Sequence, residues 1–174
     1  MIREFNAKRP KIANSAFISE NAYVVGDVEI GERSNVWPGA VIRGDFGRIV
    51  IGRDTTVEDN CVVHSGTLLG PSGDVFIGDE VLIGHGAVLN LHRIGNNVMI
   101  GMNATLLHDV TIGNFCIVAA ASLVGQGMKI PDFSLVRGAP AKIIGKPTQK
   151  QLLWVKGGNR EYGKLANRYK AEGL

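Results

Sequence analysis

Large aromatic side chains are scarce in this chain: Phe, Trp and Tyr together make up only 6% of its 174 residues. The two cysteines and the absence of a CxxC motif exclude a disulfide framework. No apolar run approaches the ~18 residues of a membrane-spanning helix, and the first residues lack the apolar core of a signal peptide. These absences favour a cytoplasmic protein whose core is not built around Phe and Trp.

Small and β-branched residues take the place of the missing rings. Glycine accounts for 23 residues, and Ile and Val together for 34, against 13 Leu. This bias favours strands in thin, regular layers. The net charge of +3 is unevenly spread, because residues 1–141 carry 11 basic and 14 acidic side chains and residues 142–174 carry 8 and 2. The body of the protein is therefore mildly acidic, and the last segment carries the positive charge.

A six-residue period runs through most of the chain and is its most informative feature. Twenty hexads can be aligned along the chain, and every hexad begins with Ile, Leu or Val. Two insertions and then a one-residue deletion divide the hexads into four uninterrupted stretches. The residue four places further on is small or β-branched in most of them. The twenty leading positions are Ile12, Ile18, Val24, Ile30, Val36, Ile42, Ile51, Val57, Val63, Ile77, Ile83, Leu89, Ile94, Ile100, Leu106, Ile112, Val118, Val124, Ile130 and Val136.

A period of six fits neither an amphipathic helix nor a simple meander, but it fits a short strand followed by a tight corner. The leading aliphatic points inward, the small residue fits below the turn, and stacked coils bury the aliphatics in ladders. The pattern resembles the left-handed parallel β-helix of the hexapeptide-repeat family, in which three hexads close one triangular coil. The resemblance implies an all-β fold of six to seven coils. That fold hosts acyltransferases, carbonic anhydrases and non-enzymes, so function must come from the site.

The sequence divides into an N-terminal extension at 1–11, the β-helix at 12–141 and a C-terminal helical segment at 142–174. We expect a first helical piece over 148–156, a break or kink at Gly157 and Gly158, and a new start capped by Asn159. An apolar stripe should then pack this helix along the coils; it consists of Tyr162, Leu165, Ala166 and Tyr169. The basic residues are interpreted as its solvated face, with no role in binding nucleic acid or membrane.

Grouping the hexads by three assigns polar side chains to faces of the prism. Arg43, His64 and Asn90 should stack outward on consecutive coils, about 4.8 Å apart. Asp59 and His85 should stack on a different face. A metal can then join His64 to His85 only where two copies of the chain abut in a threefold homotrimer. The predicted interface site contains Arg43, Asp45 and His64 from one chain with Asp59 and His85 from its neighbour.

Flat prism faces give a second reason to expect a homotrimer. Without a partner, Trp37 and apolar residues such as Val25 would be exposed on them.

Three segments around these residues resemble the γ-class carbonic anhydrases and their homologues. The segments run from Val41 to Gly47, from Val57 to His64 and from Ile83 to Leu89. The resemblance implies a trimer with a metal, usually zinc, or another divalent ion such as iron or cobalt, held by three histidines at each interface. His64 matches the first ligand and His85 the second.

The resemblance also assigns roles to the surrounding residues. Arg43, Asp45 and Asp59 match interface ion-pair residues of the family. Glu58 stands where a Gln commonly orients water or bicarbonate, and it is the nearest candidate for carrying away a proton. Tyr162 matches a tyrosine of the C-terminal helix. Phe46 occupies a position where some members carry a Glu.

The third metal ligand is where this sequence departs from the family. Asn90 stands in place of the usual histidine, and its neutral amide oxygen should bind zinc more weakly than imidazole does. His92, two residues on, is either a replacement ligand or a surface residue. His108 lies on the same face two coils from His64, and we expect it to be exposed and structural.

The implied activity is that of a carbonate dehydratase-like lyase, in which a metal-bound hydroxide converts carbon dioxide to bicarbonate. Asn90 would make it weak. Two alternatives stay open: a non-catalytic trimeric homologue that binds metal or acts as a scaffold, and a hexapeptide-repeat acyltransferase or thioesterase. The last would need a base His beside a long excursion loop, and the excursion here, Leu69 to Val75, is short and glycine-rich.

Overall fold

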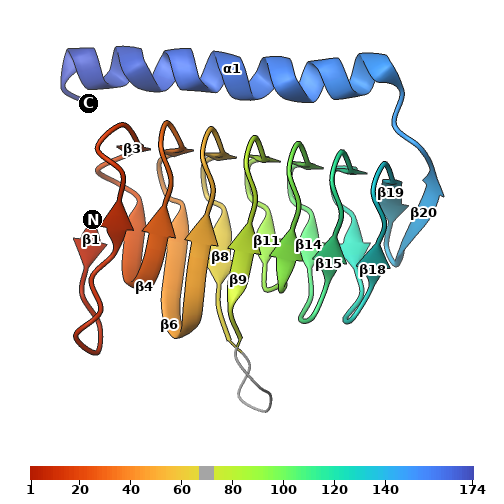
Figure 1. The fold of residues 1–174 in the computed structure, drawn as a ribbon, viewed down its shortest axis with the longest axis horizontal. Helices are drawn as coiled ribbons and strands as arrows, with labels where there is room; N and C mark the ends of the chain where they lie inside the picture. The colour runs from red at the N-terminus through yellow and green to blue at the C-terminus, as the bar shows by residue number, and fades with distance from the viewer. Residues whose placement is uncertain (67–72) are drawn as a thin grey trace.

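The computed structural model describes residues 1–66 and 73–174, and shows a left-handed parallel β-helix of about seven coils with one C-terminal helix lying along it (Figure 1). This confirms the predicted fold. Most of the excursion from Leu69 to Val75 lies outside the described residues, which resume at Gly73. Among the described residues, no helix has the length and apolar character required to cross a bilayer.

Short strands form the three faces of the prism. We call them the first face, the second face and the helix face. Strands β4 (Tyr23–Ile30) and β6 (Val41–Ile51) bend around a corner and contribute to both the first and second faces. The first face continues with β8 (Val62–His64), β11 (Val88–Leu89), β14 (Thr105–Leu106) and β17 (Leu123–Val124), and β1 (Ile2–Arg3) pairs with β4 at its start.

The other two faces follow the same parallel pattern. The second face contains β2 (Lys11–Ile12), β9 (Val75–Ile77), β12 (Arg93–Ile94), β15 (Thr111–Ile112) and β18 (Lys129–Ile130). The helix face contains β3 (Phe17–Ile18), β5 (Asn35–Val36), β7 (Thr56–Val57), β10 (Leu82–Ile83), β13 (Met99–Ile100), β16 (Ile117–Val118) and β19 (Leu135–Gly138). Strand β20 (Ala141–Gly145) then turns back antiparallel to β19.

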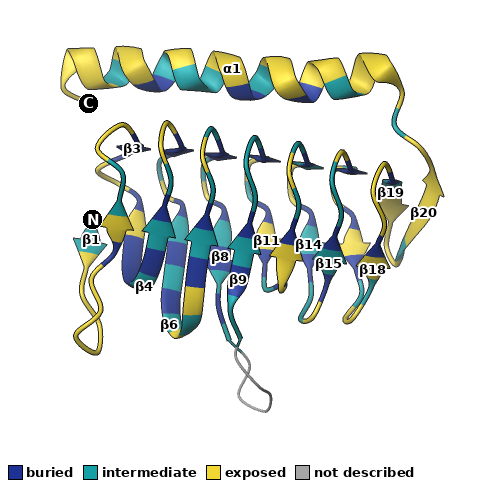
Figure 2. Cartoon of the chain, in the orientation of Figure 1, coloured by how far each residue is buried: buried dark blue, intermediate teal, exposed yellow. Residues whose placement is uncertain are grey.

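The leading aliphatic residues of the hexads form three buried ladders, as the sequence predicts. Eighteen of the twenty are at most 3% exposed, and the remaining two, in the first coil, pack against the same cluster. In Figure 2 dark blue segments, which mark buried residues, recur from coil to coil along the β-helix. One ladder is made of isoleucine alone: Ile12, Ile30, Ile51, Ile77, Ile94, Ile112 and Ile130.

The C-terminal helix α1 (Gln149–Glu172) is unbroken, so the predicted break at Gly157 and Gly158 is wrong. A capping box between Thr148 and Gln151 begins the helix. Packing against the helix face overrides the low helix propensity of the two glycines. A Cβ on Gly158 would lie 3.0 Å from Cδ2 of Leu82, so this glycine allows the helix to approach the sheet closely. Asn159 is a buried residue within the helix rather than a cap.

The predicted apolar stripe of α1 covers two aromatic residues of the first coils. Tyr162, Leu165, Ala166 and Tyr169 pack with Phe17 and Trp37, whose ring lies 5.4 Å from that of Tyr162 and 5.1 Å from that of Tyr169. Trp37 is only 3% exposed and Val25 only 7%. The expectation that a single chain would expose both residues is therefore wrong, because α1 packs on Trp37 and Val25 is already buried in the single chain.

Ile94→Ala should destabilise the protein by about 2 to 5 kcal/mol, because it removes one rung of the isoleucine ladder and leaves a cavity. Leu123→Ala, on the outer side of β17 where the side chain is 38% exposed, should cost less than about 1 kcal/mol. Urea unfolding followed by circular dichroism measures both free energies. Equal losses in the two variants would contradict the ladder as the source of stability.

Candidate functional site

Arg43, Asp45 and His64 form a connected polar group on the first face. Parallel pairing of β6 with β8 places Arg43 directly beside His64. The carboxylate of Asp45 accepts hydrogen bonds from the guanidinium of Arg43 and from Nε2 of His64, the latter at 3.0 Å. Burial opposes ionisation of Asp45, but the hydrogen bonds from His64 and Arg43 outweigh it and lower the pKa of this carboxyl.

The ionised Asp45 determines the tautomer of His64. A carboxylate only accepts hydrogen bonds, so Nε2 of His64 donates to Asp45, and Nδ1 is the nitrogen left to bind a cation. The imidazole side chain is 17% exposed and meets the ring of Phe46 in an edge contact at 5.7 Å. This side chain is thus held rigidly with one nitrogen available as a metal ligand, in the manner of carboxylate-supported histidine ligands.

Asn90 directly follows β11, at the position that corresponds to His64, the last residue of β8. The preceding residues Leu89 and Val63 are paired in register, so Asn90 and His64 are neighbours on consecutive coils. The Nδ2 of Asn90 lies 3.1 Å from Nε2 of His108. Its Oδ1 is buried and has no hydrogen-bond partner among the described residues. An unsatisfied buried acceptor costs about 1–3 kcal/mol, so this oxygen is well suited to receive a cation or a donor that the single chain lacks.

His85 lies at the corner after β10, on a different face from His64, as the sequence predicts. Its Nδ1 is 3.0 Å from Oδ2 of Asp59, and its Nε2 is 3.1 Å from Oε2 of Glu58. The backbone N–H of His85 also donates to Glu58 Oε2 at 2.8 Å. The Glu58 carboxylate is nearly buried, whereas the His85 side chain is 46% exposed. Two carboxylates therefore support a histidine that faces outward.

Tyr162 joins α1 to this second group. Its hydroxyl lies 3.3 Å from Nε2 of His85. Burial, together with the negative charge of Glu58, raises the pKa of Tyr162 well above its usual value, so the hydroxyl remains protonated and able to donate. The sequence placed Tyr162 on the helix stripe, and the structure shows that the same residue packs on Trp37 and reaches the site.

The two groups stay separate within one chain. One contains Arg43, Asp45, His64 and Asn90, and the other contains Glu58, Asp59, His85 and Tyr162. In residues 1–66 and 73–174 no cluster of three or more His, Cys, Asp or Glu side chains is arranged to hold a metal ion. A complete site would need a second copy of the chain to bring the groups together.

The structure places His92 and His108 in contacts that the sequence did not predict. His92 turns toward the second face, where its Nδ1 is 3.1 Å from the carbonyl oxygen of Asp74 and its ring meets the edge of Phe76. His108, expected to be exposed, is half-buried against Asn90. Strand register stacks Leu107 over Asn90, so only the geometry of the following turn, which hexad counting does not give, brings His108 to the amide.

Comparison with known proteins agrees with these observations. The family model "Bacterial transferase hexapeptide (six repeats)" matches residues 9–44 and 92–126. The "Probable carbonic anhydrase" of Methanocaldococcus jannaschii is 43% identical over 155 residues, which cover 89% of this chain and 95% of that protein. This chain belongs to the γ-class carbonic anhydrase-like group of the hexapeptide-repeat family.

Other relatives of this carbonic anhydrase-like chain differ in length and description. "Gamma carbonic anhydrase 1, mitochondrial" of Arabidopsis thaliana is 37% identical over 95% of the chain, and the chain spans 61% of that relative's length. The crystal structure of a hexapeptide transferase family protein from Anaplasma phagocytophilum superimposes with a TM-score of 0.89 at 32% identity and covers 97% of each chain. Family membership is therefore compatible with more than one chemistry.

Asp45→Asn should reduce stability at neutral pH by about 1 to 2 kcal/mol, because the amide accepts weaker hydrogen bonds from His64 and Arg43. The depressed pKa of Asp45 stabilises the fold above the unfolded-state pKa of about 3.9, and this contribution is lost as pH falls through the lower folded-state pKa. The difference between the parent and the variant should thus shrink below pH ~4.

Urea unfolding at neutral and acid pH measures the effect of Asp45→Asn. Glu29→Gln is the matched control, because Glu29 forms an exposed ion pair with Arg48 that contributes little. A loss at neutral pH no larger in Asp45→Asn than in Glu29→Gln would show that Asp45 does not hold this group together.

Proposed function

We propose that three copies of this chain assemble into a γ-class carbonic anhydrase-type metalloprotein that hydrates carbon dioxide reversibly. Each interface would bind a divalent cation between His64 and Asn90 of one copy and His85 of the next. The observation that carries the proposal is the pair of incomplete groups. Nδ1 of His64 and the amide oxygen of Asn90, which has no hydrogen-bond partner among the described residues, share one face. The exposed imidazole of His85 lies at a corner of the same two coils.

The donor set fits a divalent cation. Two imidazole nitrogens and one amide oxygen would serve as ligands, and zinc accepts nitrogen readily and oxygen less well. Asp45 would orient the ring of His64 and Asp59 that of His85. To bind the cation, Nε2 of His85 would exchange its contacts with Glu58 and Tyr162 for the metal. Because an amide oxygen replaces an imidazole, we expect weaker zinc binding than a site with three histidines would give.

The surrounding residues support proton handling more than substrate binding. A bound divalent cation would supply a water molecule with a pKa lowered toward neutrality. Hydration of carbon dioxide releases one proton, and Oε2 of Glu58, beside Nε2 of His85, is the carboxylate oxygen placed to accept it. The hydroxyl of Tyr162 would be a hydrogen-bond donor beside His85 and Glu58. The ring of Phe46 would exclude water beside His64.

Two other functions compete with this one. A non-catalytic trimer that binds metal or serves as a scaffold would keep the same half-sites without turnover. An acyltransferase or thioesterase is favoured by the transferase descriptions of the matching family model and of the Anaplasma structure. Opposed histidine and Arg/Asp groups on different faces favour the metalloprotein, because an acyltransferase needs one base histidine beside an acyl-binding loop.

His85→Ala should abolish metal binding while leaving the assembly intact. The His85 side chain is 46% exposed and contacts Glu58, Asp59 and the Tyr162 hydroxyl, so its removal takes polar contacts rather than core packing. His64 and Asn90 alone make a poor site. Light scattering should give three times 18.6 kDa for both the parent and the variant. Metal content, measured by inductively coupled plasma mass spectrometry on protein prepared without chelator, should fall to background only in the variant.

The same measurement on His92→Ala provides the control, since His92 contacts the second face in this structure. A parent that is monomeric and still binds metal would refute the interface site. Unchanged metal content in His85→Ala would show that His85 is not a ligand.

Asn90→His should tighten zinc binding by at least about tenfold and raise carbon dioxide hydration, because an imidazole restores a third nitrogen ligand. Zinc affinity is measured by competition with a chromophoric chelator, and hydration by stopped-flow with a pH indicator. If His92 is already the third ligand, Asn90→His will change little and His92→Ala will destroy binding. If neither variant differs from the parent in metal content or rate, the scaffold function replaces the enzyme.

A further inference from the structure

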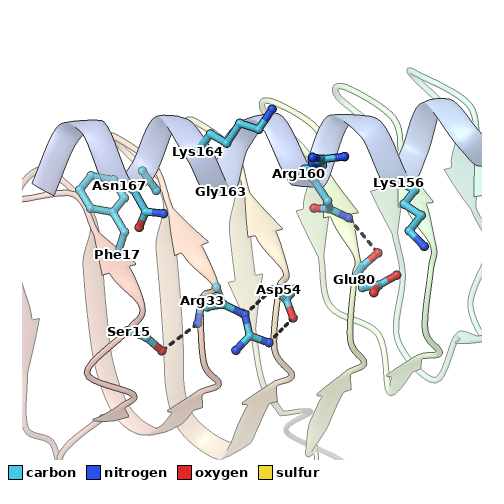
Figure 3. A pocket seen from close by; sticks show the side chains of 13 residues that line it. Ser15, Phe17, Arg33, Asp54, Glu80, Lys156, Arg160, Gly163, Lys164 and Asn167 are labelled. Carbon is cyan, nitrogen blue, oxygen red and sulfur yellow. Dashed lines mark hydrogen bonds and ion pairs between the residues drawn. The ribbon is translucent and has the colours of Figure 1, made fainter.

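A groove separate from the two half-sites runs between one edge of α1 and the corners of the first coils. Its volume is about 360 Å³, within the range of small-molecule pockets. The groove is lined on the helix side by Lys156, Arg160 and Lys164 and on the coil side by Ser15, Arg33, Asp54 and Glu80. In Figure 3 the side chain of Lys156 reaches down from the helix, whereas those of Arg160 and Lys164 lie along it. His85 and Tyr162 do not line it.

Charged side chains line both walls of the groove, and within the described part of the chain those on the helix form no ion pair with those on the coils. Lys156, Arg160 and Lys164 are spaced four residues apart and so share one edge of the helix. Lys164 pairs with Glu161 on the helix, and Arg33 pairs with Asp54 at the corners. Lys156, Arg160 and Glu80 form no ion pair within the described part of the chain. The groove therefore presents cations on one wall and a carboxylate on the other.

Gly163 is the second observation that points to a ligand. It lines the groove in the middle of α1, where glycine is a poor helix former, yet a Cβ there would meet no atom of residues 1–66 and 73–174 within 4 Å. Packing against other residues therefore does not require glycine at this position, and the absence of a side chain leaves space in the groove. Asn159 lies on the same wall; its Nδ2 donates to the carbonyl oxygen of Glu80, while its buried Oδ1 has no partner among the described residues.

We infer that this groove binds a phosphorylated sugar or nucleotide, with the phosphate on Arg160 and Lys156 and sugar hydroxyls toward Glu80. Arginine and lysine bind phosphate through charge-assisted hydrogen bonds, and a carboxylate accepts hydrogen bonds from hydroxyl groups. Because a bare phosphate uses only the cationic wall, it should bind more weakly. The inference is independent of the proposed metal site.

Isothermal titration calorimetry at low salt, with ribose 5-phosphate, adenosine 5′-monophosphate and inorganic phosphate as probes, tests the groove. The two organic phosphates should bind saturably, and inorganic phosphate at least about tenfold more weakly. Arg160→Gln and Gly163→Ala should each weaken binding by at least about tenfold, the first by removing a charge and the second by filling space. Glu80→Gln should weaken ribose 5-phosphate more than inorganic phosphate.

Two matched controls lie on the same helix outside the groove. Arg168→Gln removes the same charge elsewhere, and Gly157→Ala makes the same change at a helical glycine that also has open space around it. Both should bind like the parent, and both alanine variants should melt at or above the parent temperature. Absence of saturable binding at millimolar concentrations, or equal losses in the groove and control variants, would overturn the inference. Inorganic phosphate binding as tightly as ribose 5-phosphate would overturn the sugar assignment.

Discussion

The contact on which the rest of this structure depends is the stacking of one aliphatic side chain on the same position of the next coil. Each coil is too thin to bury its own apolar residues, so its stability comes from its neighbours. Parallel pairing fixes the coil spacing at about 4.8 Å. The outward-facing side chains of successive coils therefore lie at the same regular spacing. His64 and Asn90 are neighbours because Val63 and Leu89 are stacked.

The C-terminal helix connects features that the coils alone would leave separate. Its apolar stripe buries Trp37, and the same packing brings Tyr162 to His85. On its other edge, the basic residues border the groove above the corners of the first coils. A single element thus stabilises the helix face, completes one polar group of the site and forms one wall of a second cavity.

The sequence predicted those parts of the molecule that follow from register. Counting hexads was enough to pair Arg43 with His64 and Asp59 with His85, because a residue's place in its coil determines its neighbour in the next. It did not predict the contact of His108 with Asn90, which depends on how the chain turns after a strand. It also predicted a broken helix, since local propensity at Gly157 and Gly158 says nothing about the packing of Val155 and Asn159 against distant strands.

The antiparallel return of β20 along β19 determines how the helix face of the stack ends. A parallel solenoid with a bare final coil presents an open strand edge that could template another molecule and grow into a fibre. By reversing direction, β20 offers a strand of the wrong polarity to any incoming parallel coil. At the opposite end, Lys170 of the last helical turn donates to the carbonyl oxygen of Ser15 in the first coil. On the helix face the stack therefore ends in a strand that cannot continue the parallel pattern, whereas the other two faces end in β17 and β18.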